Sequence, residues 1–176
     1  MSSEKPATNS VNAPADGLSH VDETGAARMV NVGEKPLAHR TATATAVCRM
    51  LPQTAEQIQH NTLKKGDVLS IARIAAIQAA KRTDELIPLC HSLPLDSVGV
   101  DFQWLSNERL KISVMVSVTA RTGVEMEAMV GASIAGLTVY DMCKAVDRSM
   151  RLEEVSLESK SGGTRGDYRR AASTEP

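Results

Sequence analysis

Two neighbouring stretches, residues 97–104 and 110–121, constrain the fold of this chain more than any other feature. Both place apolar side chains at every second position: Val98, Val100, Phe102 and Trp104 in the first, and Leu110, Ile112, Val114, Val116 and Val118 in the second. This alternation predicts two half-buried β-strands. Only a short polar segment containing Ser-Asn-Glu-Arg separates them, so we expect the strands to pair as an antiparallel hairpin.

Helical patterns lie on both sides of the hairpin. Gly66 and Asp67 open a predicted helix that ends near Thr83, with Asp67 as the N-cap. A second helix is expected from Val124 to Met150, and its small residues suit close packing: Ala128, Gly131, Ala132, Ala135 and Gly136. A capping-box pattern, Thr54 followed by Gln57, predicts a shorter helix over residues 54–61.

Further strands are predicted over residues 27–33, 39–51 and 153–160, the last leading into a Gly-rich segment over 161–168. The core order is then strand, helix, strand, strand, helix, strand. This order is typical of an α+β, ferredoxin-like fold with an antiparallel sheet packed against helices. We expect the helices to cover one sheet face, and the other face to be covered by another subunit.

Length and composition predict one domain over residues 18–168. The polar residues 1–17 and 169–176 are predicted to be disordered tails. The net charge of −1 gives no broad positive field for duplex nucleic acid, and the aromatic content of 2% leaves little for stacking on bases. Three widely spaced cysteines, with no signal peptide and no membrane-spanning run, predict a cytoplasmic protein.

Several groups of polar residues could carry chemistry, and each also has an ordinary interpretation. Lysines before a helix, basic residues in a last turn, acidic residues in a first turn, a lone histidine and an ion pair three residues apart are all common without function. On the residues alone these groups indicate an anion-binding pocket with lysines. They are Lys64 to Asp67, Arg73 with Lys81 and Arg82, Cys90 with His91, Glu125 to Glu127, and Asp141 with Lys144.

Taken in order, the motifs of the chain resemble the cyclic pyranopterin monophosphate synthase family, also called the molybdenum cofactor biosynthesis protein C family. The resemblance runs from about Ser19 to Tyr168, and IPLCH, GVEMEA and YDMCKAVD are its most specific segments. It implies a lyase that converts (8S)-3',8-cyclo-7,8-dihydroguanosine 5'-triphosphate into cyclic pyranopterin monophosphate and releases diphosphate. It also implies a homohexamer, a trimer of dimers, with the active site at a subunit interface.

The resemblance further implies roles for single residues. The expected catalytic residues are Asp141, Lys144 and Lys65. The expected substrate-binding residues are Leu89, Cys90, His91, Glu125, Met126, Glu127, Lys160, Arg40, Arg73 and Arg82. We expect a small-molecule partner, the cyclic dihydro-GTP substrate, and neither nucleic acid nor membrane. The sequence requires no cofactor and leaves open whether a divalent metal such as magnesium takes part.

Three positions depart from the family pattern: Ser92 where proline is usual, Thr164 where a basic residue is usual, and Asn31 where aspartate is common. We expect Ser92 to loosen its turn and Thr164 to put a phosphate contact in doubt. Two other functions stay open. A non-catalytic regulator would be expected to lose Asp141 or a catalytic lysine, which this chain keeps. An RNA-binding module would need exposed strand aromatics, whereas Phe102 and Trp104 alternate as core residues do.

Overall fold

The structure, a computed structural model, describes residues 26–163 and 166–171. The chain forms two compact units, Met1–Val30 and Asn31–Pro176. In the described part of the first unit, Ala27 is a single bridge residue. The second unit holds all the helices and strands in the described residues: β1 (Ala38–Arg49), α1 (Pro52–Gln59), α2 (Val68–Lys81), α3 (Thr83–Leu86), β2 (Ser97–Trp104), β3 (Arg109–Ala120), α4 (Glu125–Cys143), β4 (Arg151–Ser161) and β5 (Tyr168–Arg169).

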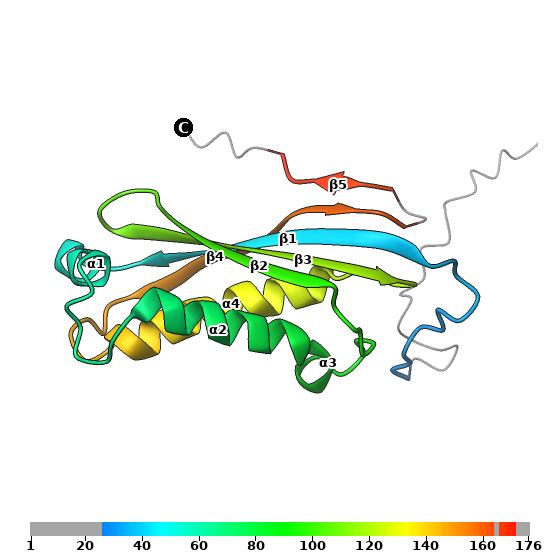
Figure 1. Ribbon diagram of the computed structural model, residues 1–176, viewed down its shortest axis with the longest axis horizontal. Helices are drawn as coiled ribbons and strands as arrows, with labels where there is room; N and C mark the ends of the chain where they lie inside the picture. The colour runs from blue at the N-terminus through cyan, green and yellow to red at the C-terminus, as the bar shows by residue number, and fades with distance from the viewer. Residues whose placement is uncertain (1–25, 164–165, 172–176) are drawn as a thin grey trace, which may run out of the picture. The chain divides into compact units, whose positions relative to one another are not determined.

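The strands form one antiparallel sheet in the order β2-β3-β1-β4-β5 (Figure 1). The predicted hairpin is confirmed, because β2 pairs with β3 from Ser97–Ser117 to Trp104–Leu110. Side chains from Leu110 to Val118 at every second position of β3 are fully buried. Phe102 and Trp104 are partly buried against the same core. The alternation in the sequence therefore marks the face that packs on the helices.

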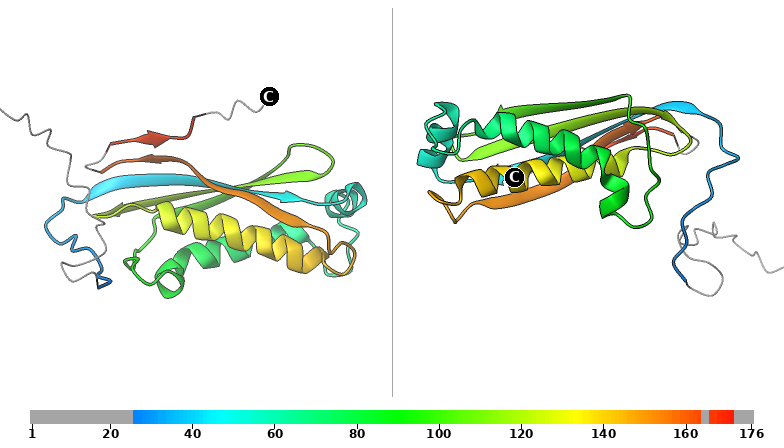
Figure 2. Two further views of the ribbon diagram at one scale, coloured as in Figure 1. Left: turned by 180° about the vertical axis from the view of Figure 1, so that it is seen from behind. Right: turned by 60° about the horizontal axis from the view of Figure 1, so that its bottom comes forward.

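Helices α2 and α4 cover one face of the sheet, and they run antiparallel to each other (Figures 1 and 2). A Cβ atom on Gly131 would lie 3.1 Å from Val114 Cγ1 and 3.3 Å from the Ala76 carbonyl oxygen. A Cβ atom on Gly136 would lie 2.3 Å from Leu152 Cδ1. The small residues of α4 thus allow this helix to approach the sheet and α2 within one chain. The α+β class and the helix-covered antiparallel sheet are confirmed.

Two predictions near the start of the fold are wrong. Residues 27–33 form no strand beyond the bridge at Ala27, and the chain turns where the Asn31 side chain accepts a 2.8 Å hydrogen bond from the Gly33 N–H. Pro36, which has no N–H to donate to a sheet, follows this turn. Thr54 is not an N-cap, because α1 already begins at Pro52, a residue that suits the first helical position.

The ends of the later elements also differ from the predictions. Helix α4 ends at Cys143 rather than near Met150, and β4 begins at Arg151 and continues to Ser161. The N–H of Asp147 bonds the Cys143 carbonyl at 3.0 Å, which closes the last turn of the chain after α4. Strand β5 was not predicted; it pairs Arg169 with Ser159 at the start of the predicted C-terminal tail. The predicted N-terminal tail, residues 1–17, lies outside the described residues.

Candidate functional site

The three expected catalytic residues lie together at the C-terminal end of α4. Lys144 Nζ lies 2.6 Å from Asp141 Oδ1, and Lys65 Nζ lies 3.4 Å from Asp141 Oδ2. Lys65 Nζ also donates to the Asp141 backbone carbonyl at 2.8 Å. Asp141 and Lys144 share a helix face because they are three residues apart. Lys65 reaches them from the loop before α2, since α2 begins beside the end of α4.

The Asp141 carboxylate forms a stabilising pair with each of the two lysines. A hydrogen bond from Lys144, the charge of Lys144 and the charge of Lys65 lower the pKa of Asp141 below its ordinary value. The same hydrogen bond and the charge of Asp141 raise the pKa of Lys144. At neutral pH the group is one carboxylate held by two ammonium groups. Both side chains are more than half exposed, Asp141 at 59% and Lys144 at 53%, so the neighbouring charges rather than burial set these pKa values.

A second group of predicted residues lies at the opposite, N-terminal end of α4. Lys160 Nζ on β4 pairs with Glu125 Oε1 at 3.0 Å. Arg40 on β1 is buried and donates to the carbonyl oxygens of Ala120 (3.0 Å) and Arg121 (3.1 Å). A Cβ atom on Gly163 would lie 2.2 Å from an Arg40 guanidinium nitrogen, so only glycine lets the end of β4 pass this close.

Glu127 is the most deeply buried carboxylate of the second group, with 4% of its surface exposed. Burial raises its pKa to about 7; a hydrogen bond from its own N–H lowers it, and the charges of Glu125 and Asp84 raise it further. Cys90 is half-buried, and its thiol pKa is raised by burial first and then by the charges of Glu127 and Asp84. The Leu89–His91 segment therefore belongs to the same end of α4 as Glu127.

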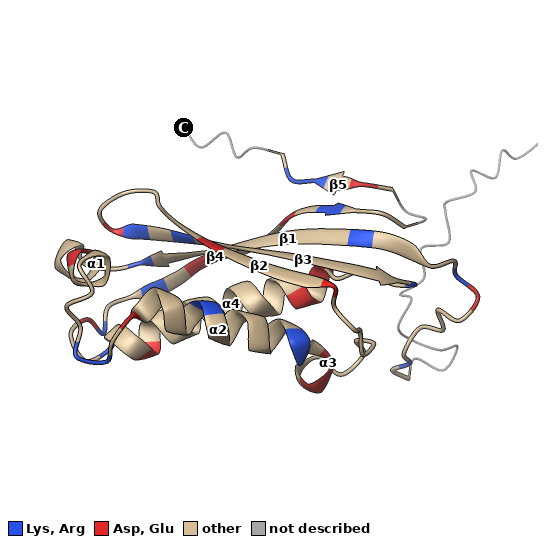
Figure 3. Cartoon of the chain, in the orientation of Figure 1, with Lys and Arg blue, Asp and Glu red and all other residues tan. Residues whose placement is uncertain are grey.

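The remaining predicted residues are less closely grouped. Leu89, His91 and Met126 are half-buried, and Arg82 is an exposed residue between α2 and α3. Arg73 turns toward β2, where it donates to the Val100 carbonyl and lies over the Phe102 ring, 5.2 Å from its centroid. The predicted residues thus divide into a Lys65–Asp141–Lys144 group and a Glu125–Glu127–Lys160 group. In Figure 3 the charged residues of α4 lie at its two ends, and α4 has no charged residue between Glu127 and Asp141.

Known proteins identify the family. The model of the MoaC family matches residues 29–163. The chain belongs to the MoaC family. It is 53% identical over 156 residues to "Cyclic pyranopterin monophosphate synthase 1" of Mycobacterium tuberculosis (strain ATCC 25618 / H37Rv), a match covering 89% of this chain and 92% of the relative. It is 52% identical over 152 residues to "Cyclic pyranopterin monophosphate synthase" of Herpetosiphon aurantiacus, covering 86% of this chain and 93% of the relative. The resemblance inferred from the motifs is confirmed.

The departures of this MoaC chain from the family pattern have different structural outcomes. The Ser92 hydroxyl donates to Asp84 Oδ2. This hydrogen bond holds the turn after His91 to α3 and opposes the expected loosening. Asn31 forms the turn that ends at Gly33. Thr164 lies outside the described residues. Asp84 is a residue that sequence reasoning missed; an acidic residue in the first turn of a short helix carries no signal of its contact with Ser92.

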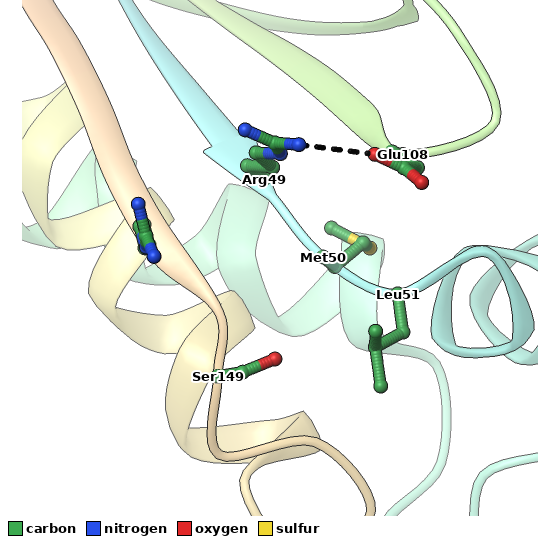
Figure 4. Close-up of a pocket in the computed structure, with 6 residues that line it drawn as sticks. Arg49, Met50, Leu51, Glu108 and Ser149 are labelled. Carbon is green, nitrogen blue, oxygen red and sulfur yellow. Dashed lines mark ion pairs between the residues drawn. The ribbon is translucent and has the colours of Figure 1, made fainter.

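A surface pocket of about 250 Å³ lies at the C-terminal end of β1 (Figure 4). Its lining contains none of the predicted site residues. It is lined by Arg49, Met50, Leu51, Glu108, Ser149 and Arg151. Arg49 Nη2 pairs with Glu108 Oε2 at 3.5 Å across this pocket.

Nowhere in residues 26–163 and 166–171 do three or more His, Cys, Asp or Glu side chains gather closely enough to hold a metal ion. Among the helices that the structure describes, none combines the length and apolar character that crossing a bilayer requires.

Proposed function

We propose that this chain is a cyclic pyranopterin monophosphate synthase of molybdenum cofactor biosynthesis. Its reaction would convert (8S)-3',8-cyclo-7,8-dihydroguanosine 5'-triphosphate into cyclic pyranopterin monophosphate and diphosphate. The observation that carries the proposal is Asp141 held between Lys144 and Lys65. Names of relatives at 52–53% identity over most of the chain support the same reaction.

The charges of the Lys65–Asp141–Lys144 group suit this chemistry. An ionised carboxylate 2.6 Å from an ammonium can accept a proton while its neighbour donates one, as opening of the imidazole-derived ring requires. Attack of a substrate hydroxyl on the α-phosphorus forms one P–O bond and breaks the bond to diphosphate, while the hydroxyl proton passes to a base. The two lysines would stabilise the charge that develops on the departing diphosphate.

The second group suits recognition of the two ends of the substrate. Glu127, buried and partly protonated near neutral pH, can face the N–H groups of the guanine-derived ring. Lys160 and His91 offer donors to phosphate oxygens, where charge-assisted hydrogen bonds are strong. Arg40 already donates to two backbone carbonyls, so we assign it the weaker role of holding the Gly162–Gly163 turn beside Lys160.

The length of α4 argues for an active site shared by two chains. At a rise of about 1.5 Å per residue, its 19 residues span roughly 28 Å. A nucleoside triphosphate is shorter, so one substrate cannot contact Lys144 at one end and Glu127 at the other end of the same helix. Both groups can surround one substrate when each comes from a different copy. This supports the homo-oligomer, which we propose to be a trimer of dimers.

Apolar side chains beside the Lys65–Asp141–Lys144 group support the same assembly. Exposed fractions reach 44% and 53% for Ile71 and Ile74 on α2, and 53% and 37% for Leu137 and Tyr140 on α4. Antiparallel packing of α2 on α4 brings these four residues to the same end of the helix layer. Exposed apolar clusters of this kind mark protein interfaces. We propose that a second copy covers them and so encloses the catalytic group.

The finer predictions complete the proposal. The strand order β2-β3-β1-β4, with two helices on one face, supports a ferredoxin-like topology. We propose a cytoplasmic enzyme that acts on a small molecule, with no nucleic-acid or membrane partner. No cofactor is required by the proposed chemistry, and assays with and without EDTA and added magnesium decide whether a divalent metal assists it.

Turnover of the cyclised dihydro-GTP intermediate tests the function. Purified protein is given the intermediate, and diphosphate release is measured together with the fluorescent pterin that forms after oxidation. The proposal expects both products from wild type. Binding of the intermediate without diphosphate release would contradict the enzyme and favour a regulator instead.

A further inference from the structure

Asp147 is a buried carboxylate outside both groups of predicted site residues. Only 3% of its surface is exposed. Its Oδ2 accepts hydrogen bonds from the Leu51 N–H (2.9 Å) and the Thr54 hydroxyl (3.2 Å). Its Oδ1 accepts hydrogen bonds from the Ser149 N–H (2.9 Å) and hydroxyl (2.7 Å). Four donors from two segments therefore converge on one side chain, and Figure 4 shows Leu51 and Ser149 on neighbouring segments.

These contacts supply what α1 lacks at its own N-terminus. Helix α1 has no side-chain cap at Leu51 and no acidic residue in its first turn. A negative charge near the first turn of a helix is stabilising because the helix dipole is positive there. The Asp147 carboxylate provides this charge from the segment that follows α4. It is the only described side chain to which Thr54, itself 1% exposed, donates.

The two segments that Asp147 joins continue into the parts of the chain that carry the expected catalytic residues. On one side, the Asp147 N–H bonds the carbonyl of Cys143, the last residue of α4, three residues after Tyr140 and two after Asp141. On the other side, the chain leaves α1 at Gln59 and soon reaches Lys65. Lys65 then returns to the end of α4 through its 2.8 Å hydrogen bond to the Asp141 carbonyl.

We propose that Asp147 is a positioning residue for the reaction. Its carboxylate holds α1 and the Lys65 loop against the C-terminal end of α4, and this contact sets the geometry of Lys65, Asp141 and Lys144. The inference rests on the proposed function for its catalytic meaning. The structural part, that Asp147 orders the Lys65 loop relative to α4, stands on the hydrogen bonds alone.

The electrostatics of the site agree with an ionised Asp147. Burial raises its pKa, but hydrogen bonds from the Leu51 N–H, from Ser149 and from the Thr54 hydroxyl outweigh burial and bring the pKa below its ordinary value. A carboxylate that accepts several hydrogen bonds stays charged at neutral pH.

The test is Asp147→Asn, which keeps the shape of the side chain. One carboxylate oxygen becomes an NH₂ group, so whichever way the amide turns, the N–H of either Leu51 or Ser149 faces a donor. Because small displacements of catalytic groups cost about 100-fold in rate, we expect kcat to fall by roughly 10- to 100-fold. We expect KM to change by less than about 3-fold, because the Glu125–Glu127–Lys160 group that would bind substrate is untouched.

Two further variants separate positioning from loss of stability. Asp147→Glu keeps the carboxylate and is expected to recover part of the lost kcat. Thr45→Val is the matched control. Thr45 lies on β1, is also buried, at 5% exposure, and donates to Glu158 Oε1 at 2.7 Å rather than to Asp147. It removes one buried hydrogen bond, so we expect a lower Tm with an unchanged kcat for each folded chain.

Hydrogen–deuterium exchange gives a readout that needs no substrate. In Asp147→Asn we expect faster exchange in residues 52–67 and 143–149, and unchanged exchange in β3. Unaltered exchange in both segments would overturn the inference whether or not the wild type turns over. If wild type is active, an Asp147→Asn protein that keeps its kcat within 2-fold, with or without a change in KM, would also overturn it. If wild type releases no diphosphate, the proposed function fails, and the exchange result still decides whether Asp147 orders the Lys65 loop.

Discussion

Replacing Glu127 by glutamine tests the environment of the most deeply buried carboxylate in the second group. Its pKa is raised from 4.5 to about 7, chiefly by burial. Between these two values the folded protein binds a proton that the unfolded chain has released. The free energy of unfolding must therefore fall as pH rises through this window, and Glu127 adds no further pH dependence outside it.

The size of the effect follows from the pKa difference. Each pKa unit corresponds to about 1.4 kcal/mol, so a shift of roughly 2.5 units makes charged Glu127 cost about 3 kcal/mol. Glutamine carries no charge at any pH. Relative to wild type, we expect the free energy of unfolding of Glu127→Gln to rise by about 3 kcal/mol as the pH goes from about 4.5 to about 8, by the same linkage relation.

Urea unfolding followed by the fluorescence of Trp104, the single tryptophan, measures this difference at a series of pH values. Protein concentration is held fixed, because assembly contributes to stability. Glu85→Gln, which removes one charge from an exposed position of α3, controls for the loss of charge. Parallel stability curves for wild type and Glu127→Gln would refute the argument that burial raises this pKa.

Three further predictions concern other parts of the molecule. Asp141→Asn and Lys144→Ala should each lower kcat by more than about 100-fold, while circular dichroism shows an almost unchanged Tm because both side chains are more than half exposed. Gly136→Ala should lower the urea-derived stability by about 1–3 kcal/mol, because its Cβ would meet Leu152 and Cys48; an unchanged midpoint would show that α4 is less closely packed than described. In the folded protein only Cys90 should react with a thiol reagent, since Cys48 and Cys143 are buried and burial raises their pKa values to about 12 and about 11. Fast labelling of all three thiols without denaturant would contradict this.

Local patterns predicted the elements whose boundaries are set locally. The period-2 alternation of β2 and β3 and the Asp67 N-cap, which accepts from the Ser70 N–H at 3.0 Å, were readable from the sequence. The end of α4 was not readable from the sequence, because Lys144 to Val146 suit a helix. The helix ends where Asp147 bonds Leu51 and Thr54, which are about ninety positions away in the sequence. The false strand over residues 27–33 has a different origin: its apolar residues alternate briefly, but the turn held by the Asn31 side chain interrupts any ladder, and Pro36 follows it.

The candidate site was predictable as a set of residues but not as an arrangement. Motif resemblance named Lys65, Asp141 and Lys144 together, and the structure brings them within hydrogen-bonding distance. The predicted helix already placed Glu127 in its first turn, away from Asp141 and Lys144, but nothing in the sequence indicated that Lys160 of β4 would pair with Glu125 there. Nor could spacing reveal that Ser92 contacts Asp84, since that hydrogen bond depends on how α3 turns back on the loop.

Mixing two inactive variants tests the central claim most directly, namely that the two ends of α4 meet across two copies to form the active site of a cyclic pyranopterin monophosphate synthase. Asp141→Asn and Lys160→Ala proteins are each assayed alone, then unfolded and refolded together in equal amounts, with diphosphate release as the readout. Random pairing in a symmetric dimer leaves about a quarter of the sites with both residues intact, so the account predicts about a quarter of wild-type activity from the mixture. If each variant alone is inactive and the refolded mixture forms the same oligomer yet stays inactive, the shared site is contradicted.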